Sequence, residues 1–324
     1  ENIKKNGSYL KRLIFDEILS TFLINSKIRA KIKKNKKDVK KFDPNIFIDI
    51  QRRLRFNLTT DQIRAIKDIN EDLMSNKKMF RLLQGDVGSG KTIVAMIACI
   101  NVISSNYQAS FMAPTEILAK QHYDFAKSIF NKNIVIELLT SKTIYSEKKR
   151  ILKDLENNKI DLIIGTHSLF QEKIRFSNLG LIIIDEQHKF GVKQRKKLSD
   201  KGGKNCDILV MSATPIPRTM VMTIFGDMDT SIIKNKPKNR KEIITYSKSE
   251  NKINEVINFV KNEIKNKNQI FWVCPLIEES KKIDHQSSVQ RHKSLIKVFG
   301  NKVGLLHGMQ DKNEKNNILI KFLK

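Results

Sequence analysis

Acidic residues are scarce in this sequence of 324 residues. It has 34 Asp and Glu against 61 Lys and Arg, so the formal net charge is +27 at pH 7. A surplus that large favours a polyanionic partner, most often nucleic acid. Charge alone also allows a second interpretation, in which the positive charge reflects a composition rich in Lys, Asn and Ile. Most of the lysines would then simply be exposed to solvent.

Cysteines and long apolar runs are also scarce. Cys99, Cys206 and Cys274 lie far apart beside apolar residues and form no CxxC pair, which predicts small buried thiols in a reducing compartment. No apolar run approaches the ~20 residues that span a membrane, and the first residues show no signal-peptide segment. We therefore expect a cytoplasmic protein with no membrane partner, and we infer no obligate protein partner.

The chain begins with a helical pattern. Apolar residues at helical spacing over 8–34, followed by KIRAKIKKNKK, predict one long helix with a basic end. The charge run at 33–41 predicts a solvated linker.

From residue 56 short apolar runs alternate with amphipathic stretches of helical length. This alternation predicts an α/β domain with a parallel sheet covered on both faces. The expected strands are 79–84, 109–114, 134–139, 161–166, 179–186 and 207–214, and the expected helices are 60–76, 92–104, 115–130 and 146–158.

A polar stretch at 234–242 predicts a linker to a second α/β unit. Apolar runs at 243–247, 269–276 and 302–308 are the expected strands there, with helices at 250–265 and 288–299. We therefore predict three parts: a helical linker at 1–55, an α/β domain at 56–235, and a partial second domain at 236–324.

The stretch LLQGDVGSGKT contains a P-loop pattern between a predicted strand and a predicted helix. Its glycines let backbone N–H groups point at phosphate oxygens at the start of the helix. Lys91 would reach the β- and γ-phosphates, and the Thr92 hydroxyl would bind Mg²⁺. The predicted ATP-binding loop is Gly85, Asp86, Val87, Gly88, Ser89, Gly90, Lys91 and Thr92.

The stretch LIIIDEQH places two carboxylates at the end of a predicted buried strand, where open α/β sheets bind ligands. Asp185 would hold Mg²⁺. Glu186 would orient and deprotonate the attacking water. His188 beside them is a candidate relay.

Four further stretches contain candidate functional residues outside the P-loop and the acidic pair. In SATPIPRT, Ser212 and Thr214 are small hydroxyl groups suited to sensing the phosphate state. In FNLTTDQ, Phe56 and Gln62 would stack on adenine and read its amino edge; the alternative is a hydrophobic staple of Phe56 and Leu58 at a helix start. Thr115 and Thr166 after two strands are candidates for a nucleic-acid backbone, or plain helix caps.

Together these stretches resemble the motor of superfamily 2 helicases. GDVGSGKT, APTEILAKQH, DEQHKFGV and SATPIPRT look most similar to the RecG family of ATP-dependent DNA helicases, and QIFWVCPLIEES resembles RecG and not Mfd. The matching motifs, in order, are the glutamine motif at 56–62, I at 85–92, Ia at 113–118, Ib at 165–167, II at 185–188 and III at 212–214.

The resemblance implies a RecA-like domain, a truncated second RecA-like domain and an N-terminal helical linker. It implies ATP and Mg²⁺ as cofactors and branched or duplex DNA as partner, in recombination and repair. It implies two further groups of residues: Gln187, His188, Ser212, Ala213 and Thr214 for coupling, and Thr115, Thr166 and His167 for DNA contact.

The sequence also departs from the family. Lys189 stands where Arg is usual, and the N-terminal wedge domain and motifs V and VI are absent from it. We therefore expect an internal fragment that binds Mg-ATP and hydrolyses it poorly. The alternatives are a Mfd-like or other superfamily 2 translocase and a non-hydrolysing nucleic-acid-binding module. A metabolic P-loop kinase is less favoured.

Overall fold

The computed structural model describes residues 8–34, 36–43, 45–54, 56–171, 174–185, 203–214, 228–235, 243–274 and 288–323. The chain divides into two compact units, 1–241 and 242–324, and each is described by itself. Over the described ranges, no helix has the length and apolar character to cross a membrane. All three cysteines are free. Cys99 and Cys206 are buried as predicted, but Cys274 is only partly buried, unlike the prediction. Burial raises the pKa of the Cys206 thiol to about 12, so this thiol stays protonated.

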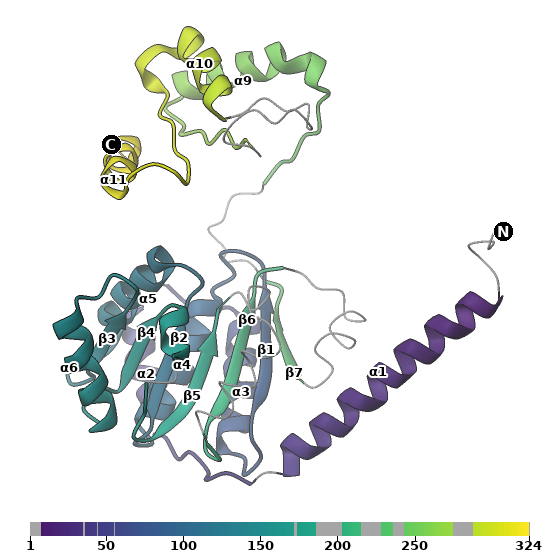
Figure 1. The fold of residues 1–324 in the computed structure, drawn as a ribbon, viewed down its shortest axis with the longest axis vertical. Coiled ribbons are helices and arrows are strands. Elements are labelled where there is room, and N and C mark those ends of the chain that lie inside the picture. The colour runs from purple at the N-terminus through teal and green to yellow at the C-terminus, as the bar shows by residue number, and fades with distance from the viewer. Residues whose placement is uncertain are drawn as a thin grey trace. The chain divides into compact units, whose positions relative to one another are not determined.

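The first unit is built on a seven-stranded parallel sheet in the order β3-β4-β2-β5-β6-β1-β7 (Figure 1). This confirms the α/β class and the parallel sheet. The strands are β1 (Phe80–Gly85), β2 (Gln108–Met112), β3 (Ile136–Leu139), β4 (Leu162–Gly165), β5 (Leu179–Ile184), β6 (Asp207–Ser212) and β7 (Asp229–Ile233).

Helices cover both faces of this sheet because its central strands are apolar on both sides. Leu181 and Ile183 of β5 belong to one core, and Ile182 and Ile184 belong to the other. The first core includes residues of α3, α4 and α5, and the second includes residues of α6. These helices are α3 (Thr60–Met74), α4 (Lys91–Ile103), α5 (Glu116–Ile129) and α6 (Tyr145–Glu156), close to the ranges predicted from the sequence.

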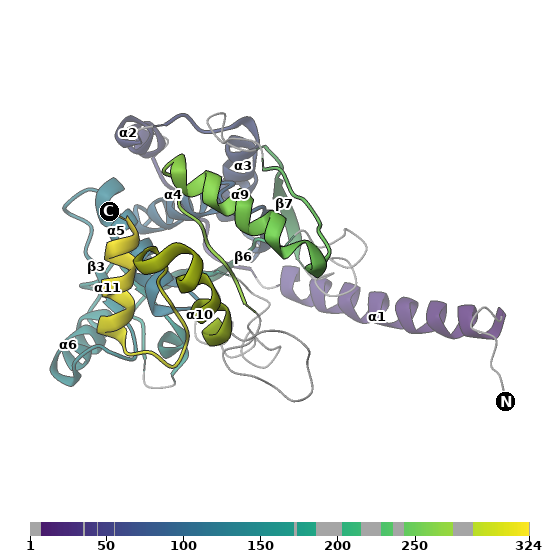
Figure 2. The same ribbon diagram turned by 90° about the horizontal axis from the view of Figure 1, so that it is seen from above.

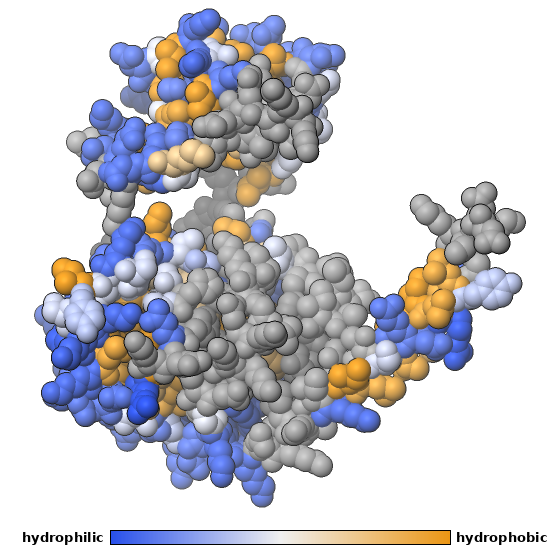
Figure 3. Space-filling model, viewed as in Figure 1, coloured by the Kyte–Doolittle hydropathy of each residue, from blue (hydrophilic) through white to orange (hydrophobic). Residues whose placement is uncertain are grey.

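The N-terminal part contains α1 (Ser8–Lys34) and α2 (Asn45–Arg53). Helix α1 is one uninterrupted helix, as predicted (Figures 1 and 2). The large apolar side chains described between residues 9 and 24 are exposed, among them Leu13 and Phe15, and they form apolar patches along the helix (Figure 3). Helix α2 instead packs on the first core through Ile46, Phe47 and Ile50.

A short segment between these helices, residues 36–43, lies along the edge of the sheet at which the strands begin. We call it the strap. Lys36 forms an antiparallel bridge with Lys77. The Lys37 N–H donates to the Asn76 carbonyl at 2.9 Å, and the Lys40 N–H donates to the Leu73 carbonyl at 3.2 Å. The strap is therefore fixed to the end of α3 by its backbone.

Two strap lysines are buried, so the expectation of a solvated charge run was wrong for them. Both side chains are 0% exposed and share one carboxylate: Lys37 Nζ lies 2.6 Å and Lys40 Nζ 2.7 Å from Asp207 Oδ2. Asp207 Oδ1 accepts the Met79 N–H at 2.7 Å, at the entrance to β1. Removal from water lowers the pKa of Lys37, and the charge of Asp207 opposes that shift. Local sequence pattern does not reveal this partner, because Asp207 lies 170 positions from Lys37 in the chain.

The second unit contains three α-helices among its described residues, α9 (Ile253–Lys265), α10 (Ser288–Phe299) and α11 (Lys312–Leu323). The predicted helices at 250–265 and 288–299 are confirmed. The apolar runs at 243–247, 269–274 and 302–308 form no strand, unlike the prediction. A strand needs a paired neighbour for its backbone groups, and no described segment of this unit supplies one.

We expect Asp207→Asn to destabilise the first unit by about 3 to 5 kcal/mol, because the two buried lysines would lose their counter-charge. Urea unfolding followed by circular dichroism measures this loss. Asp49→Asn is the matched control, since Asp49 pairs with Arg52 at 3.9 Å on the surface, and its effect should stay within about 0.5 kcal/mol. Equal losses in the two variants would contradict the role given to Asp207.

Candidate nucleotide-binding site

The P-loop connects the end of β1 to the start of α4, as predicted. Gly88 and Gly90 have positive φ angles of 73° and 84°, a region that favours glycine. Gly90 is the N-cap of α4 and has no side chain to bond the first turn. No N-cap side chain therefore competes with an anion for the N–H groups at the start of this helix.

Lys91 folds back over this loop. Its Nζ donates to the Gly85 carbonyl at 2.7 Å and to the Asp86 carbonyl at 3.0 Å, and only 9% of the residue is exposed. The ammonium group is thus held above the concave side of the loop. This is where a phosphate would have to sit to reach both the lysine and the α4 N-terminus.

Two hydroxyl groups of the P-loop region, those of Ser89 and Thr92, suit a magnesium-bound nucleotide. The Ser89 hydroxyl oxygen is buried and has no hydrogen-bond partner within the described ranges, which is costly unless a ligand supplies one. Thr92 is half-buried in the first turn of α4. Its hydroxyl and the Asp185 carboxylate are oxygen donors, which Mg²⁺ prefers. The residues present therefore fit Mg-nucleotide.

Asp185 follows β5 and is held at two points. Its N–H donates to the Met112 carbonyl at 2.8 Å, and its Oδ2 lies 3.1 Å from His122 Nε2 of α5. Glu186, Gln187 and His188 lie outside the described residues, and so does Lys189.

Ser212 ends β6, the strand between β5 and β1 in the sheet. Its hydroxyl lies 3.0 Å from that of Thr214, and Gln84 Nε2 donates to the Thr214 carbonyl at 3.3 Å. Gln84 is the residue before Gly85. The predicted sensor segment, with Ala213 at its centre, therefore contacts the strand that enters the P-loop.

Gln62 lies against the P-loop from the side of α3. Its Nε2 donates to the Ser89 carbonyl at 2.7 Å, while Oε1 accepts the Thr59 N–H at 2.8 Å in a capping box. Leu58 is buried and Phe56 is 49% exposed. The predicted contacts of Phe56 and Gln62 with adenine stay predictions.

Asp61, next to Gln62, binds the end of the described first unit. Its Oδ2 accepts the N–H groups of Lys234 at 3.0 Å and Asn235 at 2.9 Å. The hydrogen bond from Asn235 lowers the pKa of Asp61. The first turn of α3 thus joins the P-loop to the segment that leads toward the second unit.

The candidate DNA contacts lie at the ends of β2 and β4, on the same edge of the sheet. Thr115 is exposed and caps α5, with its hydroxyl accepting the Leu118 N–H at 3.3 Å. Thr166 is 9% exposed and precedes the short helix η1 (His167–Phe170). Thr115 is open to a phosphate backbone and Thr166 is largely covered. For His167 the structure describes the backbone only.

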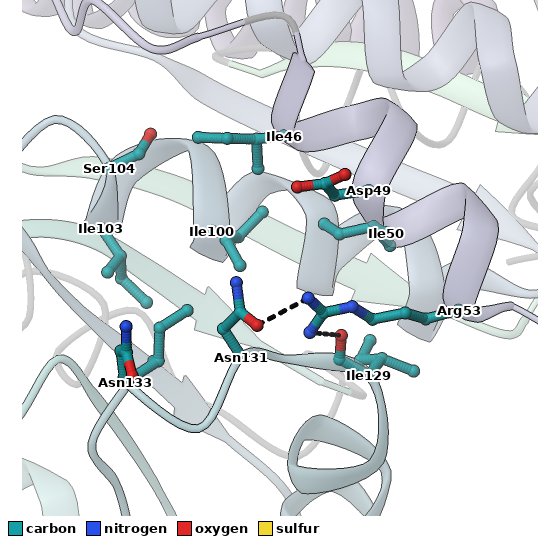
Figure 4. A pocket seen from close by; sticks show the side chains of 11 residues that line it. Ile46, Asp49, Ile50, Arg53, Ile100, Ile103, Ser104, Ile129, Asn131 and Asn133 are labelled. Atoms are coloured by element: carbon teal, nitrogen blue, oxygen red, sulfur yellow. Dashed lines mark hydrogen bonds between the residues drawn. The ribbon is translucent and has the colours of Figure 1, made fainter.

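A pocket of about 230 Å³ lies between α2, the last turn of α4 and the end of α5 (Figure 4). Isoleucines line most of it, and its Arg53 is engaged by the Asn131 side chain at 2.6 Å. It is at the opposite end of α4 from Lys91. An apolar pocket there does not suit a triphosphate.

Comparison with known proteins decides the family. The family model described as DEAD/DEAH box helicase matches residues 59–223, half of the chain, and spans the P-loop, Asp185 and Ser212. The chain belongs to the DEAD/DEAH box helicase family.

Among helicases the chain is similar to RecG. It is 45% identical to the ATP-dependent DNA helicase RecG of Thermotoga maritima over 96% of the chain and 40% of that protein. It is 41% identical to RecG of Bacillus subtilis over 96% of the chain and 46% of that protein. A solved structure of RecG bound to a three-way DNA junction superposes with a TM-score of 0.78 at 39% identity, over 96% of this chain and 41% of that one. The chain therefore spans less than half the length of these relatives.

The sequence reasoning missed three contacts in this helicase domain: His122 with Asp185, Gln84 with Thr214, and Asp61 with the 234–235 backbone. One signal was present for His122. It shares the buried face of α5 with Ala119, Ala126 and Ile129, and a polar residue on such a face needs a partner.

We expect Gly90→Ala to lower the affinity for ATP about tenfold or more. The new Cβ would strain a positive φ, at about 1 to 2 kcal/mol, and collide with Gln62 Nε2. Titration with a fluorescent ATP analogue measures this. Gly203→Ala is the control, because Gly203 also has a positive φ of 60° but nothing within 4 Å of the added Cβ. An unchanged affinity in Gly90→Ala would show that the loop does not hold the phosphates.

Proposed function

We propose that this chain is the motor part of an ATP-dependent DNA helicase of the RecG kind, which uses ATP hydrolysis to move on duplex DNA and remodel branched DNA. The observation that carries the proposal is its likeness to RecG bound to a three-way DNA junction, at 39% identity over 96% of this chain. The net charge of +27 supports a nucleic-acid partner. ATP would be the substrate of the P-loop site.

The residues of the site divide the work of phosphoryl transfer. The P-loop N–H groups and Lys91 hold the β- and γ-phosphates and offset the negative charge that develops on them. Thr92 and Asp185 hold the metal. Mg²⁺ held there would neutralise negative charge on the nucleotide. Glu186 orients the attacking water and takes its proton.

Coupling to DNA would run through the neighbours of this site. In the segment Ser212, Ala213 and Thr214, the Thr214 carbonyl accepts from Gln84 at the entrance to the P-loop. Gln187 and His188 follow Glu186 in the sequence. Loss of the γ-phosphate changes what the P-loop holds, so a segment bonded to its entrance is placed to respond. Thr115, Thr166 and His167 would lie toward the DNA backbone at the same edge of the sheet.

Two substitutions separate nucleotide binding from turnover. We expect Lys91→Ala to lose both affinity for ATP and hydrolysis, because the phosphates lose their cation. We expect Glu186→Gln to keep the affinity and to lower turnover by 10² or more, because only proton transfer is removed. Analogue titration and phosphate release measure the two quantities. Equal turnover in Glu186→Gln and the parent protein would remove Glu186 from the mechanism.

DNA specificity is tested in a protein extended to the length of its RecG relatives, by the rate of ATP hydrolysis with no DNA, single-stranded DNA, linear duplex and a model fork. We expect the fork to stimulate hydrolysis most. Raising the salt concentration from 50 to 200 mM should weaken the DNA effect steeply, because phosphate contacts release counterions. ATP binding without a response to any DNA would contradict the proposed function and leave a nucleotide-binding module of another kind.

A further inference from the structure

His122 is a buried histidine that the mechanism above leaves unused. It lies at the middle of α5, its residue is 7% exposed, and its Nε2 is 3.1 Å from Oδ2 of Asp185, itself 8% exposed. Asp185 is the acidic side chain assigned to the metal. A side chain of α5 therefore contacts the proposed metal ligand directly, and both partners of this contact are buried.

The histidine ring is fixed on its other sides. The Phe111 ring of β2 lies 4.6 Å from it between centroids, with the planes tilted by 46°. Ala119 and Ala126 flank His122 on the same buried face of α5. The Phe111 ring thus packs against the histidine, and the Asp185 backbone is fixed by its hydrogen bond to Met112.

The direction of the bond follows from the chemistry of the carboxylate. An ionised Asp can only accept hydrogen bonds, so Nε2 carries the proton and donates. The bond engages Oδ2 and leaves Oδ1 for the ion or its water. A carboxylate with one oxygen fixed in this way keeps a single orientation, which is what partners of metal ligands provide.

Resting on the proposed function, we propose that His122 is the positioning residue of the metal site. It holds the Asp185 carboxylate in the orientation that binds Mg²⁺ beside Thr92. Partners of this kind typically change metal affinity or activity by about 10- to 100-fold when removed. A histidine that merely filled the core would instead lower stability and leave the Mg²⁺ dependence of nucleotide binding unchanged.

Two amide variants of His122 test whether the hydrogen bond to Asp185 matters or only the polarity of the side chain. In His122→Gln the side-chain N–H extends about as far as Nε2 does and can still donate to Asp185. In His122→Asn the amide is shorter, so polarity is kept but the bond is lost. Asp124→Asn is the control on the same helix, because Asp124 pairs only with Lys120 at 2.9 Å on the exposed face.

The experiment measures the affinity of a fluorescent ATP analogue in the whole protein across a Mg²⁺ titration and in EDTA. We expect His122→Asn to need about 10- to 100-fold more Mg²⁺ for half-maximal tightening of binding. We expect His122→Gln to stay within a few-fold of the parent, and the affinity in EDTA to be the same in all variants. The unfolding midpoint without ligand checks that each variant is folded.

Three outcomes overturn the inference. One is an unchanged Mg²⁺ requirement in a folded His122→Asn. Another is an equal defect in His122→Gln and His122→Asn, and the third is a loss of affinity in EDTA as well. If the parent protein binds no nucleotide at any Mg²⁺ concentration, the proposed function itself fails. If the parent binds normally and only the His122 result is negative, the proposed function stands without this inference.

Discussion

The site depends on the parallel arrangement of three adjacent strands, β5, β6 and β1. Adjacent parallel strands end at the same edge of the sheet. The residues that directly follow them therefore lie close together whatever the course of the loops beyond. The P-loop follows β1, Asp185 follows β5 and Ser212 ends β6. Apolar residues on both faces of these strands fix the register in turn. The catalytic geometry is thus a consequence of how the core packs.

Neighbouring helices add precision to what the strands bring together. Gln62 bonds to the P-loop from α3, and His122 bonds to Asp185 from α5. Each is a side chain whose backbone is held by a capped helix, and each reaches a group in a loop. The P-loop itself has few side chains that could fix its conformation, since glycines make up much of it. Rigidity is therefore supplied from outside the loops.

Local pattern was enough to predict β1 to β6, α1 and α3 to α6 of the first unit, the P-loop and the position of Asp185, but not β7 or α2. Each of these depends on residues close together in the chain. The sequence could not predict contacts that join distant segments, such as Lys37 and Lys40 with Asp207, or His122 with Asp185. The runs at 243–247, 269–274 and 302–308 have strand-like composition, but pairing partners decide whether a strand forms. Composition alone cannot supply those.

The strap also changes where the motor domain begins. The helicase motifs start near Phe56, and a boundary drawn there looks natural from sequence. Such a cut would discard Lys37 and Lys40 and leave Asp207 enclosed with the Met79 N–H but without either cation. It would also remove α2 from the first core. The smallest unit that keeps both lysines paired with Asp207 starts before Lys36. In this chain the segment ahead of the motifs is therefore part of the folded domain and not a linker to it.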